Sequence, residues 1–133
     1  MNNTDLRMIE KAVTLCETNP PDKGQQRVAA IVTDSRGNIL SSGINSYSKT
    51  HPLQAKYANL NDERHHVFLH AEIAALVKNR SEEKASKIYV ARLLKNGEYA
   101  LAKPCPMCSM AIKEAGIEEI IYTEREKIVK KVV

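Results

Sequence analysis

The chain contains no Trp, one Phe, five Tyr and three Cys among its 133 residues. Because aromatic residues are scarce, a core must be built mainly from Ile, Val, Leu, Ala and Met. No apolar run approaches the roughly 18 residues of a membrane-spanning helix, and the first residues contain no hydrophobic signal-peptide core. The odd number of cysteines argues against a disulfide framework and favours thiol or metal chemistry in a reducing compartment. These absences predict a cytoplasmic protein that does not enter a membrane.

The residues that are present are typical of a globular domain. Hydrophobic residues make up 43% of the chain and charged residues 27%, which excludes both a disordered and a membrane-embedded protein. The length suits one ordinary domain and not two, so we predict a single domain over 1–133. The net charge of +4 is compatible with phosphate-bearing ligands or nucleic acid and requires neither.

The N-terminal residues predict a helix. Thr4 or Asp5 is predicted to cap a helix that runs to about Glu17. Asn and two prolines at 19–21 end it, because proline cannot continue a helix. The apolar side chains recur at helical spacing on one face: Leu6, Ile9, Val13 and Cys16.

An antiparallel hairpin follows. Residues 28–33 and 39–45 are predicted strands, and the turn at 34–38 contains Gly37, which tolerates positive φ. No clear period exists from 46 to 67, so we expect a long loop, and loops of this length are usually functional. Its basic residues are Lys49, His51, Lys56, Arg64, His65 and His66.

The second half of the chain alternates between helices and strands. The apolar spacing predicts a helix over 69–80, a strand over 87–94, a helix over 107–115 and a strand over 117–123. Such alternation after an antiparallel hairpin predicts an α/β fold with a mixed sheet covered by helices.

The C-terminal tail is too short for a helical crossover. A parallel fifth strand would need a connection of about ten or more residues, and only residues 123–133 remain after Tyr122. We therefore predict a fifth strand over 128–133 that is antiparallel to the fourth, after a turn at 123–126.

Two short motifs carry the chemistry: His70-Ala71-Glu72 and Pro104-Cys105-Pro106-Met107-Cys108. One imidazole and two thiolates are good ligands for Zn²⁺, whose tetrahedral preference leaves a fourth position for water. Cys16 is predicted to lie in the core, so no fourth protein ligand is evident and an open, catalytic site is favoured. Zinc lowers the pKa of bound water to roughly 7 and thereby provides hydroxide at neutral pH.

Glu72 is the candidate proton carrier. Residues at i and i+2 of a helix diverge by about 200°, so His70 and Glu72 must sit at a helix entrance to serve one site. There Glu72 could take a proton from the water and return it to the leaving group. Two other interpretations stay open: a dithiol redox pair at Cys105 and Cys108, and a solvated helix start at 70–72. Neither explains both motifs together.

The two motifs resemble the signature His-x-Glu…Pro-Cys-x-x-Cys of zinc deaminases, and the chain resembles the cytidine and deoxycytidylate deaminase superfamily over roughly 6–122. The resemblance implies a three-layer helix–sheet–helix sandwich with a mixed five-stranded sheet and a homo-oligomer whose subunits complete each other's pockets. It implies zinc ligands at His70, Cys105 and Cys108 and a proton shuttle at Glu72. Substrate contacts are expected from three residues: Asn45, Ala71 and Pro104.

The resemblance implies hydrolytic deamination of a cytosine nucleoside or nucleotide. The alternatives are a deaminase of a flipped-out cytosine or adenine in single-stranded DNA or RNA, and an inactive zinc-binding module. Two departures from the family's pattern bear on the substrate: residues 94–103 insert a turn before the second motif, and no long C-terminal helix pair follows. An antiparallel fifth strand resembles the branch that acts on free nucleosides.

Overall fold

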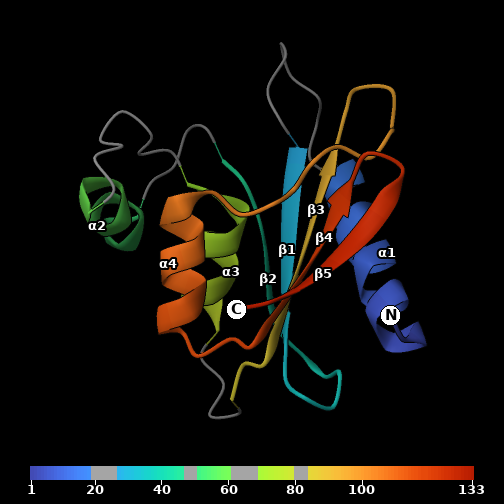
Figure 1. The fold of residues 1–133 in the computed structure, drawn as a ribbon. Helices are drawn as coiled ribbons and strands as arrows, with labels where there is room; N and C mark the ends of the chain where they lie inside the picture. Colours follow the sequence, from blue (N-terminus) through green and yellow to red (C-terminus); the bar gives the residue numbers. More distant parts are fainter. Residues whose placement is uncertain (19–26, 47–50, 61–68, 80–83) are drawn as a thin grey trace.

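A five-stranded sheet with the strand order β2-β1-β3-β4-β5 forms the centre of the molecule (Figure 1). The computed structural model describes residues 1–18, 27–46, 51–60, 69–79 and 84–133. The parallel pair is β3 with β4, and the other neighbouring pairs are antiparallel. This confirms the predicted mixed sheet with an antiparallel lead hairpin. The strands are β1 (Arg27–Thr33), β2 (Ile39–Ile44), β3 (Lys87–Leu93), β4 (Glu119–Glu124) and β5 (Lys127–Val132).

Helices cover both faces of the sheet and complete the three predicted layers. One face is covered by α1 (Asn3–Thr18), and the other by α3 (Ala71–Lys78) and α4 (Pro106–Glu114) (Figure 1). A fourth helix, α2 (Pro52–Leu60), packs against α3 and α4 on their outer side. Within the described residues, no helix is both long and apolar enough to span a membrane.

The helix α2 was missed by the sequence analysis, which predicted a loop there. Its buried residues are Gln54, Tyr57 and Ala58, so a polar side chain occupies part of the buried face. A buried face of this composition shows no apolar periodicity in the sequence. The helix can therefore be recognised only from its packing in the folded structure. His65, His66 and the Asn and prolines predicted to end α1 lie outside the described residues.

The predicted buried face of α1 is wrong at its first position. Leu6 is 40% exposed, whereas Asp5 is fully buried together with Met8, Ile9, Ala12 and Cys16. The predicted cap is also wrong, because Asn2 Oδ1 accepts the Asp5 N–H at 2.8 Å and Asn2 thus caps the helix.

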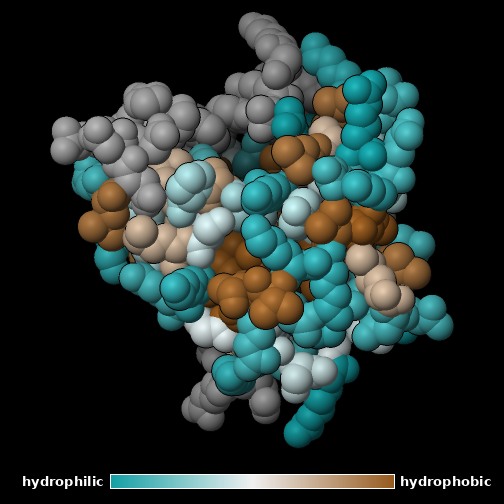
Figure 2. Space-filling view, viewed as in Figure 1, coloured by the Kyte–Doolittle hydropathy of each residue, from teal (hydrophilic) through white to brown (hydrophobic). Residues whose placement is uncertain are grey.

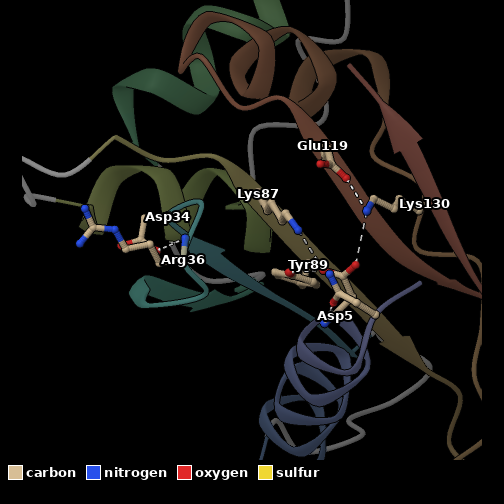
Figure 3. Close-up of polar contacts among 8 residues, drawn as sticks. Asp5, Asp34, Arg36, Lys87, Tyr89, Glu119 and Lys130 are labelled. Atoms are coloured by element: carbon tan, nitrogen blue, oxygen red, sulfur yellow. Dashed lines mark hydrogen bonds and ion pairs between the residues drawn. The ribbon is translucent and has the colours of Figure 1, made fainter.

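Asp5 is buried because partners from the two strands β3 and β5 neutralise it (Figure 3). The Tyr89 hydroxyl donates to it at 2.6 Å, and the ammonium groups of Lys87 and Lys130 lie 3.3 and 3.5 Å away. Lys130 also pairs with Glu119 at 2.8 Å. Burial alone would raise the pKa of Asp5, but these contacts outweigh it and hold the pKa below its ordinary value. The cluster therefore stabilises the packing of α1 on β3 and β5 until acid protonates the carboxylate.

The C-terminal residues form the predicted antiparallel strand. Residues of β5 pair with β4 from Glu124↔Lys127 to Glu119↔Val132, and Glu126 takes the left-handed conformation in the turn with φ 67°. The strand lies at the sheet edge, and Val132 is 77% exposed. Apolar side chains gather in the middle of the face shown in Figure 2, where the chain ends in Figure 1.

The position of α3 on the sheet depends on Gly43 of β2. A Cβ atom at Gly43 would lie 2.6 Å from the backbone N of Ala75 and 2.7 Å from the Cβ of Ala74. The Ser41 hydroxyl also donates to the Ala75 carbonyl at 2.7 Å. Only glycine at this position lets α3 approach β2 so closely. The close approach fixes the position of the N-terminus of α3 relative to the sheet.

Replacing Gly43 with Ala should lower the free energy of unfolding by about 1–3 kcal/mol, because overpacking forces the helix away from the strand. Urea unfolding monitored by circular dichroism measures the change. Ser42→Ala, the next residue of the same strand, is the matched control and should unfold near the wild-type midpoint. A Gly43→Ala protein with wild-type stability would show that α3 does not rest on β2 this closely.

Candidate active site

The first sequence motif lies at the N-terminus of α3. His70 is the residue before the helix, with extended φ and ψ of −80° and 150°, and Glu72 lies in the first turn. Because His70 is outside the helical turn, its side chain and that of Glu72 line the same cavity. The predicted placement of both residues at a helix entrance is confirmed.

The second motif lies in the same way at the N-terminus of α4. Cys105 is the residue before the helix, with φ −68° and ψ 168°, and Pro106 occupies the first turn. Proline suits this position because its missing N–H would have no partner inside the helix. Both cysteines of the motif, Cys105 and Cys108, therefore lie near the positive end of the helix dipole, which favours thiolates.

Three donor atoms from the two helices converge. His70 Nδ1 lies 3.7 Å from Cys105 Sγ and 3.3 Å from Cys108 Sγ, and all three atoms lie within 4.8 Å of one another. A nitrogen and a sulfur bound to one tetrahedral Zn²⁺ at ordinary bond lengths are about 3.6 Å apart. The donor set and its spacing therefore fit a zinc ion with three protein ligands.

The protonation states of the cysteines complement each other. A hydrogen bond from Cys108 and a second contact with His70 lower the pKa of Cys105 to about 4, although burial opposes this. Donating that hydrogen bond, together with burial, raises the pKa of Cys108 well above its ordinary value. Burial alone would lower the pKa of His70, but the contact with Cys105 outweighs it and raises the pKa. A metal ion must displace the Cys108 proton, so metal affinity should increase with pH.

Glu72 is buried beside the three donor atoms. Only 6% of the residue is exposed, and it interacts electrostatically with both Cys105 and His70. Burial raises the pKa of the Glu72 carboxyl. A carboxyl in such an environment can hold and release protons closer to neutral pH than an exposed one.

A cavity of about 180 Å³ opens next to these groups. It lies where the end of β2 meets the start of α3, because Ser46 and Leu69 pair through two backbone hydrogen bonds of 2.9 and 3.1 Å. Its lining comprises Val28, Asn45, His70, Ala71, Glu72, Arg92, Leu101, Ala102, Lys103 and Cys105.

Asn45 is held in one orientation at the cavity wall. The Val28 N–H donates to its side-chain Oδ1 at 3.0 Å, and its own N–H donates to the Val28 carbonyl at 3.2 Å. The residue is 6% exposed. Since the oxygen faces Val28, the amide nitrogen is the polar atom on the other side of the side chain.

The structure places the remaining sequence candidates in different surroundings. Ala71 lines the cavity, whereas Pro104 lines a neighbouring hollow of about 150 Å³ between α4 and the last strands. His51 caps α2, because its Nδ1 accepts the Leu53 N–H at 3.0 Å. Cys16 is fully buried in the core, as predicted, and donates to the Ala91 carbonyl at 3.2 Å.

Three residues at or near the site were not identified from the sequence. Gln54 of α2 is fully buried, and its Oε1 accepts the backbone N–H of His70 at 3.2 Å. Arg92 and Lys103 line the cavity. An arginine near the end of a central strand, directly after the hydrophobic residues 88–91, was the available signal for Arg92.

The comparisons with known proteins agree with this site and fold. Residues 2–124 match the family described as the cytidine and deoxycytidylate deaminase zinc-binding region. The fold is similar to that of cytidine deaminase from Mycobacterium leprae, with a TM-score of 0.56, 15% identity and coverage of 92% of this chain and 88% of that one. It is also similar to dCMP deaminase from the cyanophage S-TIM5 in complex with dCMP and dUMP, with a TM-score of 0.58, 23% identity and coverage of 92% and 82%.

Cytidine deaminase from Mycobacterium tuberculosis is a third similar structure, with a TM-score of 0.57, 17% identity and coverage of 93% and 88%. No curated protein sequence matches the chain. At these identities, the three structures confirm the predicted three-layer fold.

Proposed function

This chain belongs to the cytidine and deoxycytidylate deaminase family, and we propose that it is a zinc-dependent hydrolytic deaminase of a cytosine nucleoside or nucleotide. The observation that carries the proposal is a cluster of three zinc-type donor atoms beside a cavity that His70, Cys105 and the buried Glu72 line. A purely structural zinc site has no use for such a carboxyl and would have a fourth protein ligand.

His70, Cys105 and Cys108 would hold the metal. When bound by three protein ligands, zinc supplies a hydroxide nucleophile near neutral pH, because its fourth position stays open to water. The protein contributes two thiolates at a helix N-terminus and an imidazole just before a second helix. These fixed positions would hold the metal beside the cavity that takes the base.

Glu72 moves the protons of the reaction. Water adds to C4 of cytosine, the C4–N4 bond breaks, and the products are the uracil derivative and ammonia. Glu72 takes the proton that the attacking water loses and delivers it to ring nitrogen N3. It then takes the proton that the new C4 hydroxyl loses as the carbonyl forms, and passes it to the departing amino group. The burial that raises its pKa supports this role, since a general acid–base works best with a pKa nearer the operating pH.

Substrate contacts are proposed for Asn45 and Ala71, which line the cavity, and for Pro104, which lines the neighbouring hollow that shares Lys103 with the cavity. The Asn45 amide, oriented by Val28, is the contact for a sugar hydroxyl. A cavity of about 180 Å³ is smaller than the roughly 300–1,000 Å³ that enclose a drug-sized ligand, which suits a nucleobase with its sugar toward the opening.

A small substrate is favoured over a polynucleotide. Single-stranded nucleic acid is usually bound by exposed aromatic side chains on which bases stack. Tyr57, an aromatic residue within the basic segment 46–67, is only 3% exposed and cannot stack on a base. The antiparallel β5 also matches the ending that the resemblance associates with free nucleosides.

Ammonia release by zinc-loaded protein tests the proposal. The panel comprises cytosine, cytidine, deoxycytidine, CMP, dCMP, adenosine, guanine and a short cytosine-containing oligonucleotide. We expect turnover of at least one free cytosine nucleoside or nucleotide and none of the oligonucleotide. Folded protein with about one zinc per chain and no turnover of any compound would instead identify a zinc-binding module, and turnover of the oligonucleotide alone would identify a nucleic-acid deaminase.

A further inference from the structure

Two cationic side chains line the candidate cavity, and neither has a carboxylate partner in the part of the chain that the structure describes. Arg92 is half-buried and Lys103 is exposed, and both form part of the cavity wall with Glu72. Neither forms an ion pair within the described ranges of the chain. Arg92 Nη1 donates to the Leu101 carbonyl at a long 3.4 Å, and its buried Nε has no acceptor among the described residues.

The backbone holds Arg92 firmly at this position. Its N–H donates to Thr123 Oγ1 at 3.1 Å, and its carbonyl accepts the Ala100 N–H at 2.9 Å. In the sheet it lies opposite Val28, next to the strand end that carries Asn45. The Arg92 side chain is therefore carried by β3, the middle strand of the sheet, and not by a loop.

The side of the sheet on which Arg92 lies is the side of the candidate site. Along β3, Ile88 and Val90 face the core under α3 and α4, whereas Tyr89 and Ala91 face α1. Because side chains alternate along a strand, Arg92 continues the row of Ile88 and Val90. A guanidinium that ends an apolar row loses hydration, which is unfavourable unless an anion or other acceptor replaces the water.

The inserted segment 94–103 completes the cationic wall. After the Gly97 turn, Tyr99 pairs with Leu93, and the Ala102 N–H donates to the Thr123 carbonyl at 2.9 Å. These contacts return the chain along the ends of β3 and β4 and place Lys103 at the cavity. The insertion thus adds a second positive charge to the wall that Arg92 begins.

We propose that Arg92, assisted by Lys103, binds the phosphate of the substrate and makes the enzyme selective for cytosine nucleoside monophosphates over nucleosides. This inference rests on the proposed function and narrows its substrate. The planar guanidinium presents paired N–H donors that match two phosphate oxygens, and the ammonium of Lys103 adds a mobile point charge. The antiparallel β5, by resemblance, favours free nucleosides as substrates, whereas Arg92 and Lys103 favour monophosphates. One experiment decides between these two expectations.

The experiment compares kcat/KM for CMP and dCMP with that for cytidine and deoxycytidine. The wild-type protein should prefer the monophosphates. Arg92→Met should lower kcat/KM for the monophosphates by about 10- to 100-fold, because a charged hydrogen bond to the phosphate is lost. The kcat/KM for the nucleosides, which have no phosphate, should change less than twofold. Arg92→Lys should retain part of the preference. Lys95→Gln, which removes an exposed charge from the same insertion, is the matched control and should behave as wild type.

Several results would overturn the inference. A wild-type protein that turns over nucleosides as well as monophosphates has no phosphate site, although the proposed function would stand. An equal loss for both substrate classes in a folded Arg92→Met protein would mean that Arg92 contacts the base or sugar. If no compound is deaminated, the proposed function fails, and calorimetric binding of dCMP against deoxycytidine, with inorganic phosphate as competitor, still decides the role of Arg92.

Discussion

Replacing Glu72 with Gln should abolish nearly all ammonia release while the protein keeps its fold and its zinc. The amide is almost isosteric with the carboxylate, but it cannot carry a proton. General acid–base groups typically contribute 10²–10⁴-fold to the rate, and Glu72 would serve more than one proton transfer in a turnover. Because Gln has nearly the same size and shape as Glu, it should fill the same buried place beside Cys105 and His70, and the donor atoms should keep their positions.

Two measurements on the same preparation separate this outcome from misfolding. Metal analysis should give about one zinc per chain in Glu72→Gln, and its thermal unfolding should be within a few degrees of wild type. Glu98→Gln, a change of an exposed carboxylate in the 94–103 insertion, should leave activity and zinc content intact. Retention of a third of the wild-type rate by Glu72→Gln would show that another group carries the proton.

The site could be predicted from the sequence because its residues depend on local structure. His70 and Cys105 each directly precede a helix, and capping position, Pro106 and motif spacing are local signals. The convergence of the two motifs was predictable only because one imidazole and two thiolates together suit one metal ion. The fifth strand was predictable for a related reason, since a turn at 123–126 is too short for the crossover that a parallel strand needs.

The features that the sequence analysis missed depend on contacts between distant residues. Asp5 takes the buried place predicted for Leu6 because Tyr89, 84 residues further along the chain, donates a hydrogen bond to it. Gln54 appears as an ordinary polar residue until α2 packs beside His70. Arg92 can be recognised as a cavity residue only in the folded structure, where the 94–103 insertion folds back along β3 and lines the cavity with it. No local period or propensity encodes such pairs.

Cys105→Ala should lose zinc and a substantial part of the stability of the protein. Two remaining ligands, His70 and Cys108, bind zinc far more weakly than three, and the free energy of metal binding contributes to folding. Chelation should lower the melting temperature of the wild-type protein toward that of Cys105→Ala and leave the variant unchanged. Zinc content by metal analysis should fall from about one per chain to near zero.

A second cysteine variant controls for lost packing. Cys16 is fully buried in the core under α1, on the opposite face of the sheet from the metal-type donor set. Cys16→Ala should therefore lower the melting temperature through a cavity while one zinc per chain remains bound. The response to a chelator, and not the stability alone, therefore distinguishes a ligand from a core residue.

Zinc binding by the wild-type protein should also weaken as the pH falls, because Cys108 must give up its proton and the pKa of its thiol lies well above the ordinary value. A Cys105→Ala protein that keeps a full zinc ion, or X-ray absorption that shows four protein ligands in the wild type, would contradict an open three-ligand site and with it the hydrolytic mechanism.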